Sequence, residues 1–337
     1  MKAYSLHNVD DLRYEDISMP ECNPGWVIVQ VKAAGICSSD VPRIFTKGTY
    51  HFPTVPGHEF SGIVHSVADD SNIHLVGKHV GVFPLIPCRN CKPCSDKHYE
   101  MCEHYDYIGS RRDGAFAEYV AVPVWNLIEI PENMPFEVAA MLEPFSVALH
   151  AIKFGNVTAI DNVAIIGTGM IGLAAGLWAR KTGAKHVTVI GRNEDKRNMV
   201  EHCQLAYSIG LDCDDQDKYD FVLEAVGTPD AVEMAINATK RGGRLVLMGN
   251  PSGDIPLKQS VYWKILRKQL KITGTWNSSY DGKNPSDWTD AVQTLSNIDA
   301  ASLITHRFNQ DKLTDGLELM RKHKEPYCKV MTLWNQE

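Results

Sequence analysis

The chain has 337 residues, of which 44% are hydrophobic and 22% charged, a composition typical of globular proteins and a length that suggests two domains. Its 34 Lys and Arg residues against 41 Asp and Glu residues give a net charge of −7, which argues against general nucleic-acid binding. We predict no signal peptide and no membrane span, because the longest weakly polar run, 163–179, is glycine-rich and shorter than the roughly 20 apolar residues a span needs. We therefore expect a cytoplasmic protein with neither a nucleic acid nor a membrane as partner.

The first 150 residues are predicted to be β-rich, because short runs of Val, Ile and aromatic residues alternate there with Gly, Pro and Asn. Strands are expected over 26–36, 60–67, 79–86 and 116–123. A helix is expected to follow over 135–152.

From Asn156 to Trp276, apolar strands and helical patterns alternate, which is typical of βαβ units on a parallel sheet. Strands are predicted over 162–167, 186–191, 219–227, 244–250 and 270–276. Helices are predicted over 170–183, 194–204, 229–243 and 258–269. The tail, from about residue 280, contains two further helical segments and a strand over 327–334, which we expect beside the N-terminal β region rather than in the parallel sheet.

A glycine motif of the form G-x-G-x-x-G follows the first strand of this region and begins its first helix. That context favours a dinucleotide-binding loop over an ordinary glycine-rich turn. The first glycine permits the tight turn, the second lets the backbone approach a pyrophosphate, and the third lets the helix pack against the strand. The predicted cofactor-binding residues are Gly167, Thr168, Gly169, Met170, Ile171 and Gly172.

Four cysteines lie within fifteen residues at the spacing C-x2-C-x2-C-x7-C. Such clustering in a cytosolic chain favours a metal over disulfides, and four thiolates suit a closed, structural Zn²⁺ site. A ferredoxin-like cluster is the alternative, but it usually shows C-x3-C-P at the last spacing, which is missing here. The predicted ligands are Cys88, Cys91, Cys94 and Cys102.

A second and more dispersed set of possible ligands consists of Cys37, His58, Glu59 and Glu143. Glu143 lies within an apolar run, and a buried carboxylate needs a partner. One sulfur, one nitrogen and two oxygens suit a catalytic zinc that keeps one exchangeable position.

The motifs GICSSD, GHEFSG, EPFSVALHA and GTGMIG, together with the four cysteines, resemble the zinc-dependent medium-chain dehydrogenases, and within them the polyol (sorbitol-type) branch. The resemblance spans nearly the whole chain. It implies an α/β protein with a GroES-like β-rich catalytic domain and a Rossmann dinucleotide-binding domain. The first comprises residues 1–150 and 280–337, with a structural-zinc lobe at 88–102, and the second comprises residues 151–279.

The resemblance also assigns roles to residues. Cys37, His58, Glu59 and Glu143 would bind the catalytic zinc, the two glutamates either directly or through water. Ser39 would relay the alcohol proton, although it also suits a helix N-cap, and Asp40 would orient the histidine ligand. Ser39, Asp40 and Glu59 are therefore the predicted catalytic residues, and the chain would carry two zinc ions. The implied assembly is a homodimer or a homotetramer.

Gly191 and Arg192 end the second strand of the predicted Rossmann domain, 24 residues after Gly167. NAD-binding proteins usually place an Asp or Glu here to bind the ribose hydroxyls. The family favours NAD, but a glycine that leaves space and an adjacent cation favour a 2′-phosphate, so we predict NADP over NAD. Asn193 and Arg197 would assist, whereas the nearby Glu194 and Asp195 could instead bind ribose or serve as first-turn helix charges.

For the substrate, the segments 37–62, 105–119 and 263–276 resemble enzymes that oxidise polyol phosphates such as galactitol 1-phosphate. A phosphate needs cations, and arginine suits it. The alternative interpretation of each cation is a solvated surface charge, and a neutral polyol or another secondary alcohol of the sorbitol, threonine or butanediol type is the alternative substrate. The candidate residues are Arg43, Arg111, Arg112 and Asn277, with Lys264, Arg267 and Lys268 as further cations.

Two other functions compete with this prediction. One is a zinc-free quinone or enoyl reductase on the same fold, which would lack the Cys, His and Glu set. The other is a non-catalytic, zinc-stabilised structural protein, which would not need intact ligands for a catalytic metal.

Overall fold

The structure, a computed structural model, describes residues 1–212, 215–283 and 285–335. The chain forms two units, the first made of Met1–Glu143 with Ser279–Glu337 and the second of Pro144–Ser278. Each unit has its own buried apolar core.

The first unit is built around a sheet in the order β16-β17-β3-β4-β5-β9, with β8 also paired to β3. Two small two-stranded sheets, β1-β2 and β6-β7, accompany it. Its strands are β1 (Lys2–Asn8), β2 (Asp11–Asp16), β3 (Trp26–Ile36), β4 (Glu59–Val67), β5 (His79–Val82), β6 (Leu85–Ile86), β7 (Asp106–Tyr107), β8 (Tyr119–Pro123), β9 (Leu127–Glu129), β16 (Ile304–Asn309) and β17 (Lys329–Leu333). Its helices are α1 (Asp40–Pro42), α2 (Lys92–Ser95), α3 (Phe136–Ala139), α9 (Asp287–Leu295) and α10 (Leu313–Lys322).

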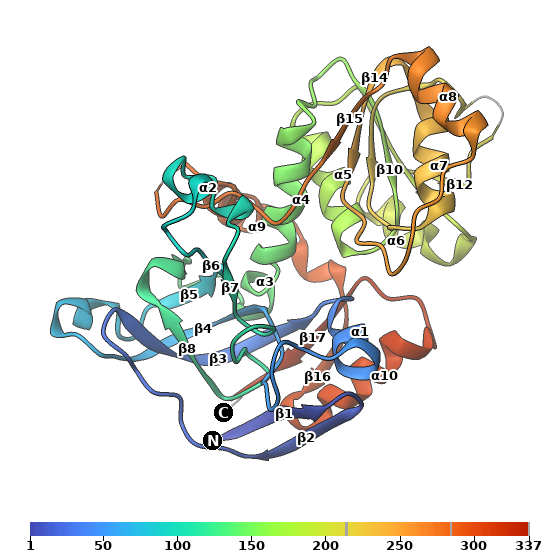
Figure 1. Ribbon diagram of the computed structural model, residues 1–337. Coiled ribbons are helices and arrows are strands. Elements are labelled where there is room, and N and C mark those ends of the chain that lie inside the picture. The colour runs from blue at the N-terminus through green and yellow to red at the C-terminus, as the bar shows by residue number, and fades with distance from the viewer. Residues whose placement is uncertain (213–214, 284, 336–337) are drawn as a thin grey trace. The chain divides into compact units, whose positions relative to one another are not determined.

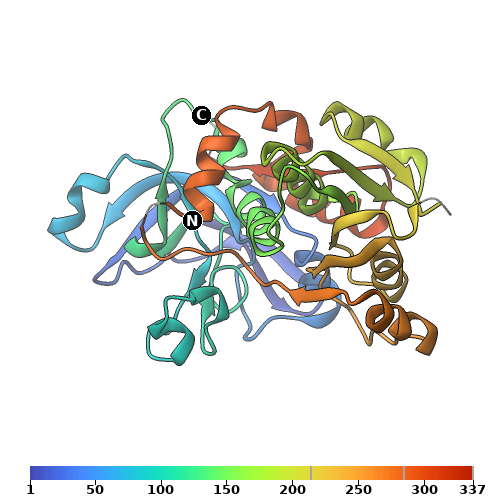
Figure 2. The same ribbon diagram turned by 90° about the horizontal axis from the view of Figure 1, so that it is seen from above.

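The C-terminal strand β17 lies where the sequence predicted it, antiparallel to β3, with Val330 opposite Ile36 and Leu333 opposite Ala33. Strand β4 pairs with the other side of β3 and places Glu59 opposite Gly35. Three strands from distant parts of the sequence therefore lie side by side (Figure 1). The segment around α2, drawn in teal, extends from this unit as a separate lobe, as Figure 2 also shows.

The second unit is a six-stranded sheet in the order β12-β11-β10-β13-β14-β15, and every neighbouring pair is parallel. This is the doubly wound order of a Rossmann fold. Helices lie on both sides of the sheet, with α5 against β10 and β11 and α7 against β13 and β14 (Figure 1). The elements are α4 (Leu142–Phe154), β10 (Asn162–Ile166), α5 (Met170–Lys181), β11 (His186–Gly191), α6 (Arg197–His202), β12 (Ala206–Ile209), β13 (Tyr219–Glu224), α7 (Pro229–Ala238), β14 (Thr239–Leu247), α8 (Gln259–Lys268) and β15 (Lys271–Gly274).

Two expected elements are divided in the structure. The helix predicted over 135–152 is two helices, α3 and α4, because Pro144 has no N–H and is accommodated only in the first turn of a new helix. The strand predicted over 79–86 is divided into β5 and β6, on either side of Pro84, which has no N–H to donate to a neighbouring strand.

The helix predicted over 229–243 was wrong in its last residues, since α7 ends at Ala238 and Thr239 already begins β14. The Thr239 hydroxyl donates to Ala235 O and helps to end the helix. Residues from Thr239 onwards pair with β13, so tertiary pairing outweighs the helical pattern of the sequence there.

Candidate active site and metal sites

The predicted catalytic ligands meet at the ends of β3 and β4. Cys37 follows β3, His58 directly precedes β4, and Glu59 is the first residue of β4. Because β3 and β4 are antiparallel neighbours, their two ends lie together, and one ligand atom from each of these three residues falls within 4.8 Å of the others. His58 and Glu59 are buried, while Cys37 is partly exposed, so the group is open to solvent on one side.

Asp40 lies behind this group and is fully buried. Its Oδ2 accepts a hydrogen bond from the Cys37 N–H at 2.9 Å, and its Oδ1 lies 3.5 Å from His58 Nδ1. Burial alone would raise the pKa of Asp40, but the neighbouring His58 and the Arg43 guanidinium hold it below its ordinary value. Asp40 thus places a carboxylate beside one ring nitrogen of His58, a position from which it could orient a histidine ligand.

Ser39 is half-buried, and its Oγ donates to Cys37 Sγ at 3.3 Å. It occupies the N-cap position of α1, but its side chain makes no capping hydrogen bond. The Ser39 side chain therefore does not cap α1, and its role as a proton relay stays a prediction.

Glu143 lies in the first turn of α4 and outside the group of three ligands. Its Oε1 accepts a hydrogen bond of 3.3 Å from the Tyr107 hydroxyl, and the Tyr107 ring contacts His58 edge-on at 5.8 Å between centroids. Burial, followed by the negative charge of Glu59, raises the pKa of Glu143 to about 7. The two carboxylates therefore interact, although they have different partners.

Lys329, which sequence reasoning missed, is the partner of Glu59. Its side chain is 3% exposed, and its Nζ forms an ion pair with Glu59 Oε2 and donates to Ile36 O at 3.2 Å. Burial alone would lower the pKa of Lys329, but Glu59, Cys37 and Glu143 together outweigh burial and raise it. One feature of the sequence could have pointed to this residue, because Lys329 is a charged residue at the start of the otherwise apolar strand β17.

Gly35 makes the contact between Lys329 and Glu59 possible. A Cβ on Gly35 would lie 2.6 Å from Glu59 Oε2 and 3.3 Å from Lys329 Cδ. Since Gly35 lies on the strand between these two residues, any side chain there would separate the ammonium from the carboxylate.

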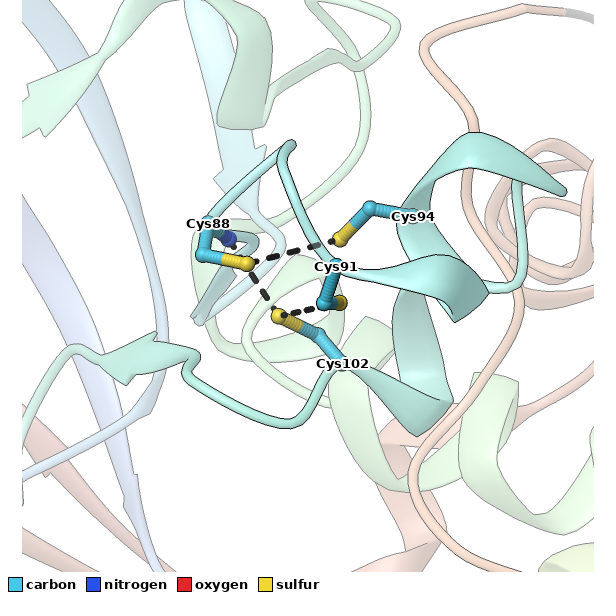
Figure 3. Close-up of side chains that lie close together, drawn as sticks. All are labelled: Cys88, Cys91, Cys94 and Cys102. Atoms are coloured by element: carbon cyan, nitrogen blue, oxygen red, sulfur yellow. Dashed lines mark hydrogen bonds between the residues drawn. The ribbon is translucent and has the colours of Figure 1, made fainter.

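The four clustered cysteines converge in the lobe around α2 (Figure 3). The Sγ atoms of Cys88 and Cys94 are 4.0 Å apart, and those of Cys91 and Cys102 are 3.9 Å apart. These spacings are close to the edge of about 3.8 Å for a tetrahedron with Zn–S bonds of about 2.3 Å, and far from a disulfide length of about 2.05 Å. A backbone hydrogen bond from Asn90 lowers the pKa of Cys88 to about 6, whereas burial raises the pKa of Cys94 to about 12, so the sulfur spacing rather than the acidity of the thiols supports a metal here. The four side chains thus fit a closed metal site.

The glycine motif lies between β10 and α5, with Gly169 at the N-cap of the helix. A Cβ on Gly172 would collide with the carbonyl of Gly167, whereas one on Gly169 would meet nothing within 4 Å. Gly172 is therefore required for helix packing, and Gly169 borders open space at the N-terminus of α5. This arrangement suits a pyrophosphate.

The end of β11 differs from expectation in one respect, because the space left by Gly191 is occupied. A Cβ on Gly191 would overlap the hydroxyl of Tyr207, which reaches across from β12 and donates to Asn193 O at 2.5 Å. Sequence reasoning missed Tyr207, since nothing in its local pattern relates it to position 191.

The two predicted arginines near this strand end have different surroundings. Arg197 donates two hydrogen bonds to Glu194 and one to Glu201, and it stacks on the Tyr207 ring at 5.0 Å. Arg192 is exposed and has no hydrogen bond or ion pair with any residue that the structure describes.

The substrate candidates are not brought together. Arg43 pairs with Asp40 at 2.5 Å, so it lies beside the ligand group. Arg111 is stacked between the rings of Tyr50 and Tyr105, each 4.3 Å away.

The other candidates have structural partners or lie elsewhere. Arg112 forms an ion pair with Asp106 and stacks on the Trp26 ring. Asn277 belongs to the second unit. Lys268 is buried and donates hydrogen bonds to three backbone carbonyls. Lys264 donates to Asn237, and Arg267 stacks on Trp263.

Known proteins resemble this chain along its whole length. The family profile of the alcohol dehydrogenase GroES-like domain matches residues 23–132, and that of the zinc-binding dehydrogenases matches residues 171–297. Galactitol 1-phosphate 5-dehydrogenase from Escherichia coli (strain K12) is 33% identical over 312 residues, which cover 89% of this chain and 90% of that enzyme. L-threonine 3-dehydrogenase from Aeromonas hydrophila is 28% identical over 100% of both chains.

Solved structures give the same result. The crystal structure of galactitol-1-phosphate dehydrogenase from Escherichia coli has a TM-score of 0.89 at 32% identity, over 99% of this chain and 100% of that one. An Escherichia coli alcohol dehydrogenase complexed with NADH has a TM-score of 0.90 at 27% identity, over 99% of both chains. A zinc-binding dehydrogenase from Sinorhizobium meliloti bound to NADP has a TM-score of 0.88 at 26% identity, over 98% of both chains.

In the described ranges, no helix combines the length and the apolar character needed to cross a membrane. The predicted fold class, a GroES-like unit with a Rossmann unit, is confirmed by the family profiles and the solved structures. The chain belongs to the zinc-dependent medium-chain dehydrogenases and is an oxidoreductase of the alcohol and polyol dehydrogenase type.

Proposed function

We propose that this enzyme interconverts a secondary alcohol of a polyol or polyol phosphate and the corresponding ketose, using one catalytic zinc and NADP(H). The observation that carries the proposal is the group of Cys37, His58 and Glu59, whose ligand atoms lie within 4.8 Å of one another and which is open on one side. Glu143, whose pKa is raised to about 7 by burial and by the charge of Glu59, would supply the fourth ligand, a carboxylate oxygen, directly or through water.

When bound there, zinc would lower the pKa of the substrate hydroxyl, and the nicotinamide would accept the hydride. The residues have separate tasks. Ser39, half-buried beside Cys37, would pass the hydroxyl proton outwards, and Asp40 would hold His58 with one ring nitrogen directed to the metal. Lys329 would supply a counter-charge to Glu59 through their buried ion pair.

We also propose a second, structural zinc at Cys88, Cys91, Cys94 and Cys102. All four positions of a tetrahedral shell would be filled by thiolates, which leaves none for substrate. The sulfur spacing of 3.9–4.0 Å supports this assignment.

The preference for NADP over NAD is proposed from Arg192. It is the exposed cation at the end of β11 that has no partner among the described residues, whereas Arg197 is neutralised by Glu194 and Glu201. The same pairing occupies Glu194 and so weakens its candidacy as a ribose ligand. The test is the ratio of the KM values for the two cofactors: a lower KM for NAD⁺ than for NADP⁺ would contradict the proposal.

For the substrate, the relative that acts on galactitol 1-phosphate supports a polyol phosphate, with Arg43 as the cation nearest the ligand group. A neutral polyol or another secondary alcohol is the second candidate, favoured by the structural partners that already engage Arg111 and Arg112. We also propose that the enzyme works in the cytoplasm and assembles as a homodimer or homotetramer. Light scattering of the purified enzyme would test the assembly.

One experiment tests the proposed function as a whole. Zinc per chain is measured first, and oxidation of a panel of polyols and polyol phosphates is then assayed with each cofactor. Two zinc ions and chelator-sensitive turnover are expected. One zinc ion without turnover would support a zinc-stabilised, non-catalytic protein instead.

A further inference from the structure

Tyr107 is a polar side chain at the ligand group that the proposed chemistry does not use. It lies in β7, and its hydroxyl donates to Glu143 Oε1 at 3.3 Å while its ring contacts His58. The residue as a whole is half-buried, whereas Glu143 and His58 are buried.

The two carboxylates of the site differ in their partners within the protein. Glu59 is paired with the charged Lys329, whereas Glu143 is hydrogen-bonded to the neutral Tyr107 hydroxyl. A buried carboxylate oxygen without a hydrogen-bond or ion-pair partner is costly in free energy. Each carboxylate therefore needs a donor, here Lys329 or Tyr107, whenever it does not bind a metal. A bond to a neutral hydroxyl is weaker than an ion pair and is more easily exchanged for a metal.

We infer that Tyr107 is a positioning residue, which gives the Glu143 carboxylate a second position, hydrogen-bonded to the tyrosine hydroxyl. If Glu143 served as a metal ligand, the Tyr107 hydroxyl would hold its carboxylate by a hydrogen bond whenever the carboxylate was not bound to the metal. Glu143 lies outside the 4.8 Å group of Cys37, His58 and Glu59 and is hydrogen-bonded to Tyr107, so the tyrosine can hold the carboxylate away from the three ligands. The inference rests on the proposed function, because it assumes a metal at this site.

The substitution Tyr107→Phe removes only the hydroxyl and keeps the ring against His58. Without its second partner, Glu143 should stay on the metal. We therefore expect Co²⁺ loaded at this site to be released to a chelator about tenfold more slowly than from the parent enzyme. We expect kcat to fall by a similar factor, because one hydrogen bond to a charged group contributes free energy on this scale. The visible spectrum of bound Co²⁺ should also respond less to added alcohol than in the parent enzyme.

Whether Tyr107→Phe slows or speeds metal release decides whether Tyr107 is a second partner for Glu143. If Tyr107 merely braced a permanent ligand, Tyr107→Phe would speed metal release, and either that result or an unchanged rate overturns the inference. In a Glu143→Gln background, Tyr107→Phe should leave the release rate unchanged, and an effect that persists there also overturns it.

Two controls separate other causes. Tyr105→Phe removes a nearby hydroxyl that has no hydrogen bond to any described residue, and it should leave metal release as in the parent. The zinc count of the parent enzyme is measured first, because a chain without a metal at Cys37 refutes the proposed function itself, independently of Tyr107.

Discussion

At the scale of single residues, the site depends on a contact between two residues that lie far apart in the sequence, Lys329 and Glu59. Lys329 crosses over Gly35 to reach Glu59, and both partners are 3% exposed. Removing one member of a buried ion pair leaves an uncompensated charge, which costs more than the pair contributes.

The substitution Lys329→Met should therefore lower the free energy of unfolding by about 3–5 kcal/mol, the usual cost of breaking a buried pair. Urea denaturation of the zinc-loaded and the zinc-stripped protein checks this. The matched control is Lys2→Met, which breaks the exposed pair with Asp16 and should change little. A loss no larger than that of the control would mean that Glu59 is compensated by another group.

Gly191 provides the second prediction at this scale. Gly191→Asp would introduce the ribose-binding acid of NAD enzymes, but its Cβ would overlap the Tyr207 hydroxyl. We expect the single variant to melt at a lower temperature and to bind both cofactors poorly. The double variant Gly191→Asp/Tyr207→Ala should recover stability relative to the sum of the single changes and shift the KM ratio towards NAD⁺. Strictly additive changes in melting temperature would show that the two positions are not coupled.

At the scale of elements, the dinucleotide helix depends on how closely it approaches its strand. Gly172→Ala places a methyl group against the Gly167 carbonyl, while Gly169→Ala meets nothing within 4 Å. Both changes should weaken cofactor binding, but only Gly172→Ala should also destabilise the second unit, by about 1–3 kcal/mol as expected for overpacking. Thermal unfolding without cofactor distinguishes them, and equal melting temperatures for the two variants would contradict the packing argument.

Elements with strong patterns were predictable, and those defined by their neighbours were not. The apolar strand β10 and the glycine-led helix α5 begin within a residue of expectation, because periodicity and caps are local signals. Strand β12 was missed because it is a four-residue edge strand whose residues are at most half-buried. The early start of β14 was missed because pairing with β13 determines it.

The same distinction holds for the site. Cys37, His58 and Glu59 could be selected from sequence because their residue types and motifs are specific, and the structure places them together. Lys329, Tyr107 and Tyr207 could not, because each acts through a partner at least 14 residues away, a relation that only strand pairing and packing create.

At the scale of the whole molecule, each unit has its own core, and the cysteine lobe belongs to the first unit only. We expect Cys91→Ser to reduce zinc from two ions per chain to one and to lower the melting temperature of the protein, since a structural zinc contributes folding energy. Metal analysis with calorimetry checks this, and Cys22→Ser, outside both clusters, is the control. Retention of two zinc ions in Cys91→Ser would refute the assignment of the lobe.

The position of β17 also affects how the protein is made. Lys329 leaves the ribosome 270 residues after Glu59, and until then β3 has an open edge and Glu59 lacks its counter-charge. The sheet of the first unit therefore cannot be completed before residue 329 has been synthesised, so we expect metal loading at Cys37, His58 and Glu59 to follow that point rather than precede it. A premature stop codon upstream of 329 would release a chain with an unpaired strand edge and an uncompensated carboxylate, features that favour aggregation and proteolytic removal.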